Sequence, residues 1–207
     1  MNLTKHSNMD NSTIQYYNTN AKDYFENTVN LDLTQFYDPF LELIPEQGKK
    51  ILDAGCGSGR DSLFFKKKGF EIIAFDASEE LVKLSSDLLK QPVLHMTFED
   101  LSFSNEFDGI WTCASLLHVP KDQMPAVLKK LADALKENGI LYASFKYGNG
   151  EYVNKGRLFT SYDKASFEKL VSRKPNLKVV KMWLTEDVRP DRAGEMWLNV
   201  LLMKIST

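Results

Sequence analysis

The sequence has little cysteine, no long apolar run and no excess of charge. Its only cysteines, Cys56 and Cys113, stand in no CxxC or Cys/His spacing, which disfavours a metal site and suits a reducing compartment. No stretch reaches the roughly 18 apolar residues that a membrane span requires, and residues 1–20 lack the apolar segment of a signal peptide. We therefore expect a cytoplasmic protein with no metal and no membrane partner.

The charges nearly balance, with 26 Lys and Arg residues against 28 Asp and Glu residues and a formal net charge of −2. Such a chain has no overall positive field to hold a phosphate backbone, so we expect no nucleic-acid partner. The 207 residues contain neither a fixed-period repeat nor a linker rich in Pro, Gly or Ser. We expect a single domain, and the sequence leaves the oligomeric state open.

From Lys50 onward, short apolar runs alternate with helical patterns. We predict strands over residues 51–54, 71–76, 92–96, 107–114 and 139–146, separated by helices over residues 61–68, 79–89 and 121–136. Strands that alternate with helices of about 10–15 residues are typical of a parallel sheet covered on both faces. The pattern predicts an α/β fold.

The two ends of the chain differ from this core. The first dozen residues resemble a disordered arm, and an aromatic stripe at helical spacing then predicts one or two helices before Pro45. Towards the other end, a helix over residues 162–173 precedes two extended runs, 177–185 and 196–204. Because only a loop separates these runs, we expect an antiparallel hairpin at one edge of the sheet.

The sharpest motif is a buried strand that runs into a triple-glycine turn and then a helix, Asp53-Ala-Gly55-Cys-Gly57-Ser-Gly59-Arg60. Glycines let the backbone turn tightly and approach a ligand, and the helix N-terminus offers free N–H donors. Asp76 ends the next strand, where a carboxylate can accept hydrogen bonds from both hydroxyls of a ribose. Together these features predict a nucleoside site. The dinucleotide pattern GxGxxG is not met, because Arg60 stands where its third glycine would fall.

The spacing DxGxGxG resembles the first motif of class I S-adenosylmethionine-dependent methyltransferases. Residues 96–103, 107–118 and 135–141 resemble the later motifs of the same family, so the resemblance covers residues 50–146. It implies a three-layer, Rossmann-like sandwich with a mostly parallel sheet of about seven strands and an antiparallel edge hairpin. Within the family, the chain is similar to the small bacterial tellurite-resistance and type 11 enzymes.

The resemblance also implies a division of labour along the single domain of residues 1–207. Residues 1–48 would form an N-terminal arm and a lid, 49–146 the cofactor-binding core, and 147–207 a substrate-side loop, helix and hairpin. Contacts to the cofactor S-adenosyl-L-methionine, which leaves as S-adenosyl-L-homocysteine, would come from nine residues: Asp53, Gly55, Cys56, Gly57, Asp76, Ala77, Phe98, Glu99 and Cys113. Many family members carry an aspartate where this chain has Thr97.

The sequence also offers candidates for the catalytic and substrate-binding residues. His118 follows the fourth strand and is either a general base for the acceptor or a cap of the turn before Pro120. We expect the segment from Lys146 to Arg157 to form a loop at the carboxyl edge of the sheet. The candidate substrate contacts are Tyr17, Tyr24, Lys146, Arg157 and Arg189. The two arginines, with Arg192, either hold an anionic acceptor together or have a solvated or ion-paired role at the surface.

The predicted function is methyl transfer to a small-molecule acceptor at O, N, S or a metalloid by in-line displacement. The fourth strand leads into Cys113-Ala-Ser-Leu116 and lacks the Asn/Asp-Pro-Pro-aromatic signature of nucleobase amine methyltransferases. Two other classes stay open. One is a non-catalytic module that binds S-adenosylmethionine or S-adenosylhomocysteine, and the other is an NAD-dependent oxidoreductase.

Overall fold

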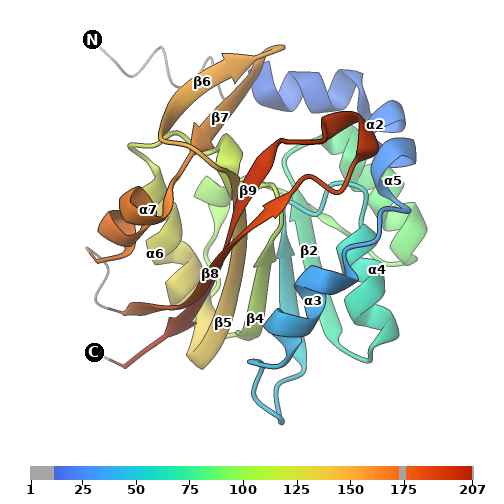
Figure 1. Ribbon diagram of the computed structural model, residues 1–207. Coiled ribbons are helices and arrows are strands. Elements are labelled where there is room, and N and C mark those ends of the chain that lie inside the picture. Colours follow the sequence, from blue (N-terminus) through green and yellow to red (C-terminus); the bar gives the residue numbers. More distant parts are fainter. Residues whose placement is uncertain (1–11, 173–175, 207) are drawn as a thin grey trace.

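A seven-stranded sheet runs through the centre of the molecule, in the order β3-β2-β1-β4-β5-β9-β8 (Figure 1). The computed structural model describes residues 12–172 and 176–206. The strands are β1 (Lys50–Ala54), β2 (Glu71–Asp76), β3 (Leu94–His95), β4 (Phe107–Thr112), β5 (Leu135–Lys146), β8 (Leu177–Glu186) and β9 (Met196–Lys204). The pairs among β1 to β5 are parallel, whereas β9 is antiparallel to both β5 and β8.

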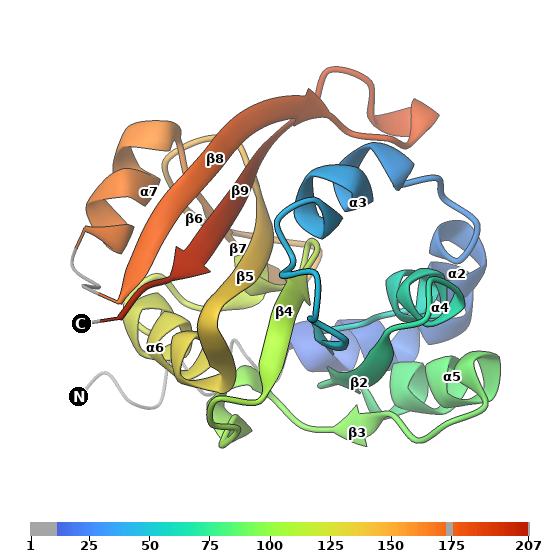
Figure 2. The same cartoon turned by 90° about the horizontal axis from the view of Figure 1, so that it is seen from below.

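Helices cover both faces of this sheet (Figure 2). One side carries α3 (Thr34–Leu41), α4 (Arg60–Lys67) and α5 (Glu79–Leu89), and the other carries α6 (Met124–Ala134) and α7 (Lys164–Val171). Each face has its own buried apolar cluster, and Phe40 and Phe65 belong to one cluster and Leu128 and Phe167 to the other. The strands between the layers are buried on both sides, so they carry continuous apolar runs such as Ile51–Leu52.

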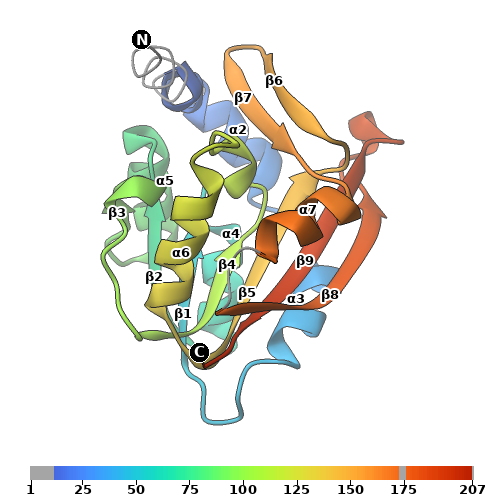
Figure 3. The ribbon, with the colours of Figure 1, turned by 90° about the vertical axis from the view of Figure 1, so that its left-hand side faces the viewer.

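Two elements lie outside the three layers. Residues 12–19 are helical and lead into α2 (Ala21–Thr28), while β6 (Gly150–Asn154) and β7 (Arg157–Ser161) form a separate two-stranded hairpin. The hairpin stands beside the N-terminal helical residues above the carboxyl ends of the parallel strands (Figure 3). Ser12 donates a hydrogen bond to the carbonyl of Gly156 at 2.8 Å, which joins the two elements.

The α/β fold, the alternation of elements and the antiparallel pair are confirmed, and α5 and β9 have the predicted bounds. The fourth strand ends at Thr112, before Ala114 adopts a positive φ of 52°. The arm predicted over the first dozen residues lies, up to residue 11, outside the described residues, as does residue 173 at the end of the predicted helix 162–173.

The prediction of a loop over residues 146–157 is wrong, because most of this segment belongs to the β6–β7 hairpin. The two residues that join the strands, Lys155 and Gly156, have positive φ values of 51° and 78°. This is the backbone of a type I′ turn, which suits the twist of paired strands. Lysine rarely occupies the first turn position, so the sequence carries only part of the usual hairpin signal.

No helix in the described ranges 12–172 and 176–206 is long and apolar enough to cross a membrane.

Candidate functional site

The glycine loop after β1 has a backbone conformation that favours glycine. Gly55, Gly57 and Gly59 have φ values of 77°, 55° and 77°, in the left-handed region that a Cβ disfavours. A Cβ on Gly55 would also lie 2.5 Å from Cβ of Ser115, and one on Gly57 would lie 3.1 Å from the ring of Tyr24. The spacing of these glycines therefore follows from backbone geometry and from close approach by two other segments.

Asp76 stands at the carboxyl end of β2, next to this loop. Its carboxylate accepts hydrogen bonds from the backbone N–H groups of Gly57 and Ser78, both at 2.8 Å. Burial raises the pKa of Asp76, although the backbone hydrogen bonds oppose the shift. A carboxylate has about four acceptor positions, so these backbone hydrogen bonds leave acceptor capacity for a ligand.

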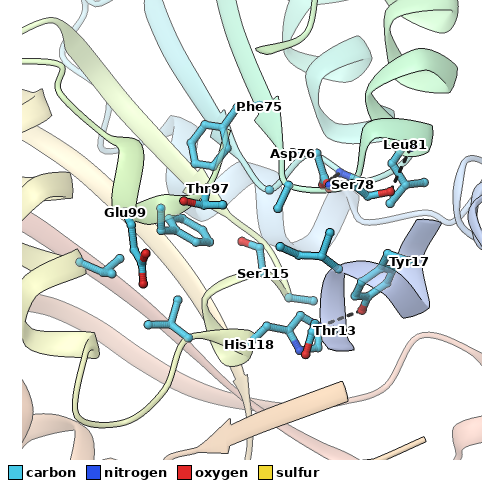
Figure 4. Close-up of a pocket in the computed structure, with 18 of the residues that line it drawn as sticks. Thr13, Tyr17, Phe75, Asp76, Ser78, Leu81, Thr97, Glu99, Ser115 and His118 are labelled. Carbon is cyan, nitrogen blue, oxygen red and sulfur yellow. Dashed lines mark hydrogen bonds between the residues drawn. The ribbon is translucent and has the colours of Figure 1, made fainter. Parts of the chain in front are cut away.

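A cavity of about 160 Å³ lies over the glycine loop and Asp76 (Figure 4). Phe98 and Glu99, from the short 3₁₀ turn Phe98–Asp100, line one end, and Phe98 packs edge-on against Phe75 at 5.3 Å. Tyr17 and His118 lie at the opposite wall. The cavity joins the carboxyl ends of β1, β2 and β4, the place where open α/β sheets bind ligands.

His118, which ends the 3₁₀ turn Leu116–His118, is held by both ring nitrogens. Nδ1 lies 2.6 Å from the carbonyl oxygen of Leu158, and Nε2 lies 2.8 Å from the hydroxyl of Tyr17. A carbonyl only accepts, so Nδ1 carries the proton and Nε2 accepts from Tyr17. Burial lowers the pKa of His118 to about 4, which keeps the ring neutral near pH 7. The histidine thus connects three segments, a role that neither sequence interpretation included.

The N-terminal helical residues cover this cavity. Thr13 accepts a hydrogen bond from the backbone N–H of Leu158 at 3.0 Å, and Asn18 accepts one from Ser78 at 2.7 Å. Together with the Tyr17–His118 hydrogen bond, these contacts attach residues 12–19 to β7, to the start of α5 and to the turn after β4. The lid suggested by the sequence for residues 1–48 stays a prediction, and residues 12–19 are, with Tyr24, the part of that range that lies at this cavity.

A second cavity, of about 90 Å³, lies on the other side of Tyr24. Tyr24 and Ala114 line both cavities. The second cavity continues between α3, the end of β5 and the loop that joins β8 to β9, where Cys113 and Arg189 line it. Burial raises the pKa of Cys113 to about 12, so this thiol stays protonated.

A buried carboxylate organises the polar end of the second cavity. Asp187 accepts from Nε and Nη2 of Arg189 at 2.8 and 2.7 Å, from Nε1 of Trp197 at 3.0 Å and from Lys146 at 3.3 Å. Lys146 also pairs with Glu195. Burial opposes ionisation of Asp187, but the hydrogen bonds and charge of Arg189 outweigh it and lower its pKa.

The structure brings most of the predicted site residues together. Nine of them line the first cavity: Gly55, Gly57, Asp76, Ala77, Phe98, Glu99, Tyr17, Tyr24 and His118. Cys113 and Arg189 line the second, as does Tyr24. Lys146 lies behind that cavity in the ion-pair network.

Three predicted residues point elsewhere. Asp53 accepts a hydrogen bond from Ser62 at 2.6 Å behind the glycine loop, where burial raises its pKa to about 8. The thiol of Cys56 is buried 3.8 Å from the hydroxyl of Ser85. Arg157 lies over the ring of Tyr16 at 4.2 Å, so it does not join Arg189 at one anion site.

Sequence reasoning missed several residues that line the first cavity: Thr13, Ile14, Ser78, Leu81, Ser115, Gln123 and Val127. Ser78 carried a usable signal, because it caps α5 by accepting from the backbone N–H of Leu81 at 3.2 Å. Thr13 and Ile14 come from a distant helix and carried none. No group of three or more potential metal ligands occurs in the part of the chain that the structure describes.

Comparison with known proteins agrees with this geometry. A family described as "Methyltransferase domain" matches residues 51–139. A putative methyltransferase of Bacillus subtilis is 32% identical over 50% of this chain and 46% of its own length. A ubiquinone biosynthesis O-methyltransferase of Coxiella burnetii is 29% identical over 66% of this chain and 62% of its own length. The chain thus spans about half to three fifths of these relatives.

Two solved structures share the fold. The 1,6-didemethyltoxoflavin-N1-methyltransferase of Burkholderia thailandensis has a TM-score of 0.75 at 19% identity, over 95% of this chain and 88% of that one. The magnesium protoporphyrin IX methyltransferase of Synechocystis has a TM-score of 0.70 at 17% identity, over 95% and 97%. These likenesses confirm the predicted Rossmann-like sandwich.

Proposed function

Since the chain belongs to the class I S-adenosylmethionine-dependent methyltransferase family, we propose that it transfers a methyl group from S-adenosylmethionine to a small-molecule acceptor. The observation that carries the proposal is the first cavity, which joins the glycine loop, the carboxylate of Asp76 and the segment at Phe98. Each of the three occupies the position at which the sequence predicted a contact to one part of this cofactor.

The residues present fit the cofactor. A Cβ on Gly55 would meet Ser115, so the loop leaves a cradle that only glycine keeps open beside its backbone N–H groups. Asp76 has acceptor positions left for the ribose hydroxyls, and Phe98 offers an aromatic face at the adenine end. When bound, the sulfonium supplies an activated methyl group, so the protein contributes mainly alignment and exclusion of water.

We propose that His118 receives the proton that the acceptor loses by way of the Tyr17 hydroxyl, which donates to Nε2. The Tyr17 ring packs against Tyr24, at the wall that the two cavities share. The Nδ1 proton of His118 is fixed by the Leu158 carbonyl, so Nε2 presents its lone pair towards Tyr17 at the cavity wall. The same carbonyl stabilises the imidazolium that proton uptake produces. A pKa of about 4 keeps Nε2 unprotonated across the physiological range, although it also makes the histidine a weak base.

We propose that the protein acts in the cytoplasm on a small acceptor, and that it has no nucleic-acid or membrane partner. The names of relatives support it, since the Coxiella burnetii relative is an O-methyltransferase of ubiquinone biosynthesis. The Burkholderia thailandensis structure has 1,6-didemethyltoxoflavin and S-adenosylhomocysteine bound. The balanced charge of this chain gives no reason to expect a polyanionic partner.

Calorimetric titration of the protein with S-adenosylmethionine, S-adenosylhomocysteine, NAD and NADP tests the cofactor. We expect micromolar binding of the first two compounds only. Preference for NAD would favour the oxidoreductase alternative. Binding of S-adenosylmethionine without turnover on a broad acceptor panel, together with recovery of a partner protein, would favour the non-catalytic module.

A further inference from the structure

We propose that the second cavity is the acceptor site and that it takes a small, uncharged aromatic compound. The inference rests on the proposed function, because the cavity gains this role only when a methyl donor occupies the first one. It replaces the anionic acceptor that the arginines suggested in the sequence, and it rests on the position, the walls and the charge balance of the cavity.

The second cavity lies next to the first, where we propose that the methyl donor binds. Tyr24 and Ala114 line both cavities, and the Tyr24 ring lies against Gly57 in the glycine loop. Ala114 holds a left-handed φ of 52°, which is unusual for a residue with a Cβ, and Ser144 accepts its backbone N–H at 2.8 Å. Strained backbone of this kind clusters at ligand sites, and here it stands at the junction of the two cavities.

The walls favour a flat apolar ring. Leu31, Leu33 and Phe36 line one side, and Trp197 lines another from β9. Such walls gain most from a ligand that buries an aromatic or apolar surface against them. The cavity is smaller than the first, about 90 against 160 Å³, which suits a single ring.

The charges favour a neutral ligand. Asp187 takes both Nε and Nη2 of Arg189, while Lys146 is shared between Asp187 and Glu195. The other guanidinium at the cavity, that of Arg60, is neutralised in the same two-pronged way by Asp61. Both arginines therefore have their charge balanced within the protein. An anionic acceptor would meet Asp187 with no free cation among the described residues that line the cavity.

The first arm of the test compares phenol with 4-hydroxybenzoate, which shares the ring and adds a carboxylate. Each is titrated into protein saturated with S-adenosylhomocysteine, and affinity is followed by saturation-transfer NMR. We expect phenol to bind about tenfold more tightly or better. Tighter binding of 4-hydroxybenzoate, or no binding of phenol, would overturn the inference.

The second arm places the ligand in the cavity. Val188→Trp fills the second cavity from the β8–β9 loop and should weaken phenol binding about tenfold or more, with affinity for S-adenosylhomocysteine retained. Val180→Trp is the matched control, because Val180 is exposed on β8. Val188→Phe serves if the larger ring prevents folding. Unchanged phenol binding in the folded filling variants would place the acceptor elsewhere.

The third arm reverses the charge balance. Asp187→Asn removes the carboxylate shared by Arg189 and Lys146, so the preference should shift towards 4-hydroxybenzoate by about tenfold in the affinity ratio. Thermal melting checks that the variant is folded. An unchanged ratio would overturn the charge argument. Failure of S-adenosylhomocysteine to bind the unmodified protein would instead contradict the proposed function.

Discussion

The two cavities share a wall but are built in different ways. The first is formed mainly where parallel strands end, by the glycine loop after β1, Asp76 at the end of β2 and Ser115 after β4. The second is assembled from α3, the end of β5 and the loop between β8 and β9. The cofactor side thus depends on backbone geometry next to a strand, and the proposed acceptor side depends on side chains that meet across long sequence separations.

This difference explains what each side can change. A glycine loop and a strand-end carboxylate contact parts that nucleoside ligands share. Their spacing is fixed by the geometry of the backbone at the ends of the strands. The second cavity is shaped by side chains such as Phe36, Val188 and Trp197, which can be exchanged without altering the strands that carry them. Specificity for the acceptor would therefore reside in the second region.

We expect the largest effect from a substitution in the glycine loop that disrupts the first cavity and leaves the second intact. Gly55→Ala places a Cβ 2.5 Å from that of Ser115 at a φ of 77°. We expect affinity for S-adenosylhomocysteine to fall about 100-fold or more, measured by calorimetry. Gly156→Ala is the control, because Gly156 has a similar φ of 78° but no atom within 4 Å of the added Cβ. Similar losses in both variants would show that strain, not crowding, is responsible.

The next largest effect should come from removing the carboxylate at the first cavity. Asp76→Ala deletes the acceptor of the Gly57 and Ser78 N–H groups and of the proposed ribose contacts. Binding of S-adenosylhomocysteine should weaken by about 1.5–3 kcal/mol, the range for hydrogen bonds to a charged group. Asp133→Ala, on the half-exposed face of α6, should leave it unchanged. Equal affinity in the Asp76 variant would remove this residue from the site.

The third effect is a pH dependence of stability, and it comes from His118, which lies between the first cavity and the N-terminal helical residues that cover it. The pKa of His118 is about 4 in the folded protein and about 6.5 in the unfolded chain, so the unfolded chain binds the extra proton first as pH falls. His118 therefore costs stability progressively from about pH 6.5 to about pH 4, on the order of 3 kcal/mol.

Urea unfolding at a series of pH values measures this loss. His118→Gln should flatten that part of the profile, whereas the same change at the exposed His95 should not. A profile with the same slope in the His118 variant would mean that another group titrates. Turnover measured on the same variant separates the proposed base from a purely structural histidine, since only the former lowers the rate without weakening the cofactor.

The smallest effect concerns the N-terminal helical residues that cover the first cavity. Tyr17→Phe keeps the ring and removes the hydroxyl that donates to His118 at 2.8 Å. The free energy of unfolding should fall by about 0.5–1.5 kcal/mol, the usual value of one hydrogen bond. Tyr147→Phe, at an exposed ring, is the matched control. An equal loss in both variants would mean that the Tyr17 hydroxyl does not hold the cover.

The fold and most of the first cavity were predictable because their signals are local. Gly55, Gly57 and Asp76 follow buried strands at spacings that backbone geometry dictates. The placement of Arg189 was not predictable, since its partner Asp187 stands in a polar loop whose path depends on β8 and β9. Nor did the sequence indicate that Asp53 turns towards Ser62, because either orientation suits a strand-end aspartate.

The sheet order has a consequence for how the molecule assembles. β9 follows β8 in the chain yet lies between β5 and β8, so β5 gains its second neighbour only after β8 has been synthesised. Trp197 lies on that inserted strand. Pairing at such long sequence separation is slow to form. During synthesis, the glycine loop and its parallel strands can therefore be in place while the second cavity, the proposed acceptor site, still lacks the wall that Trp197 provides.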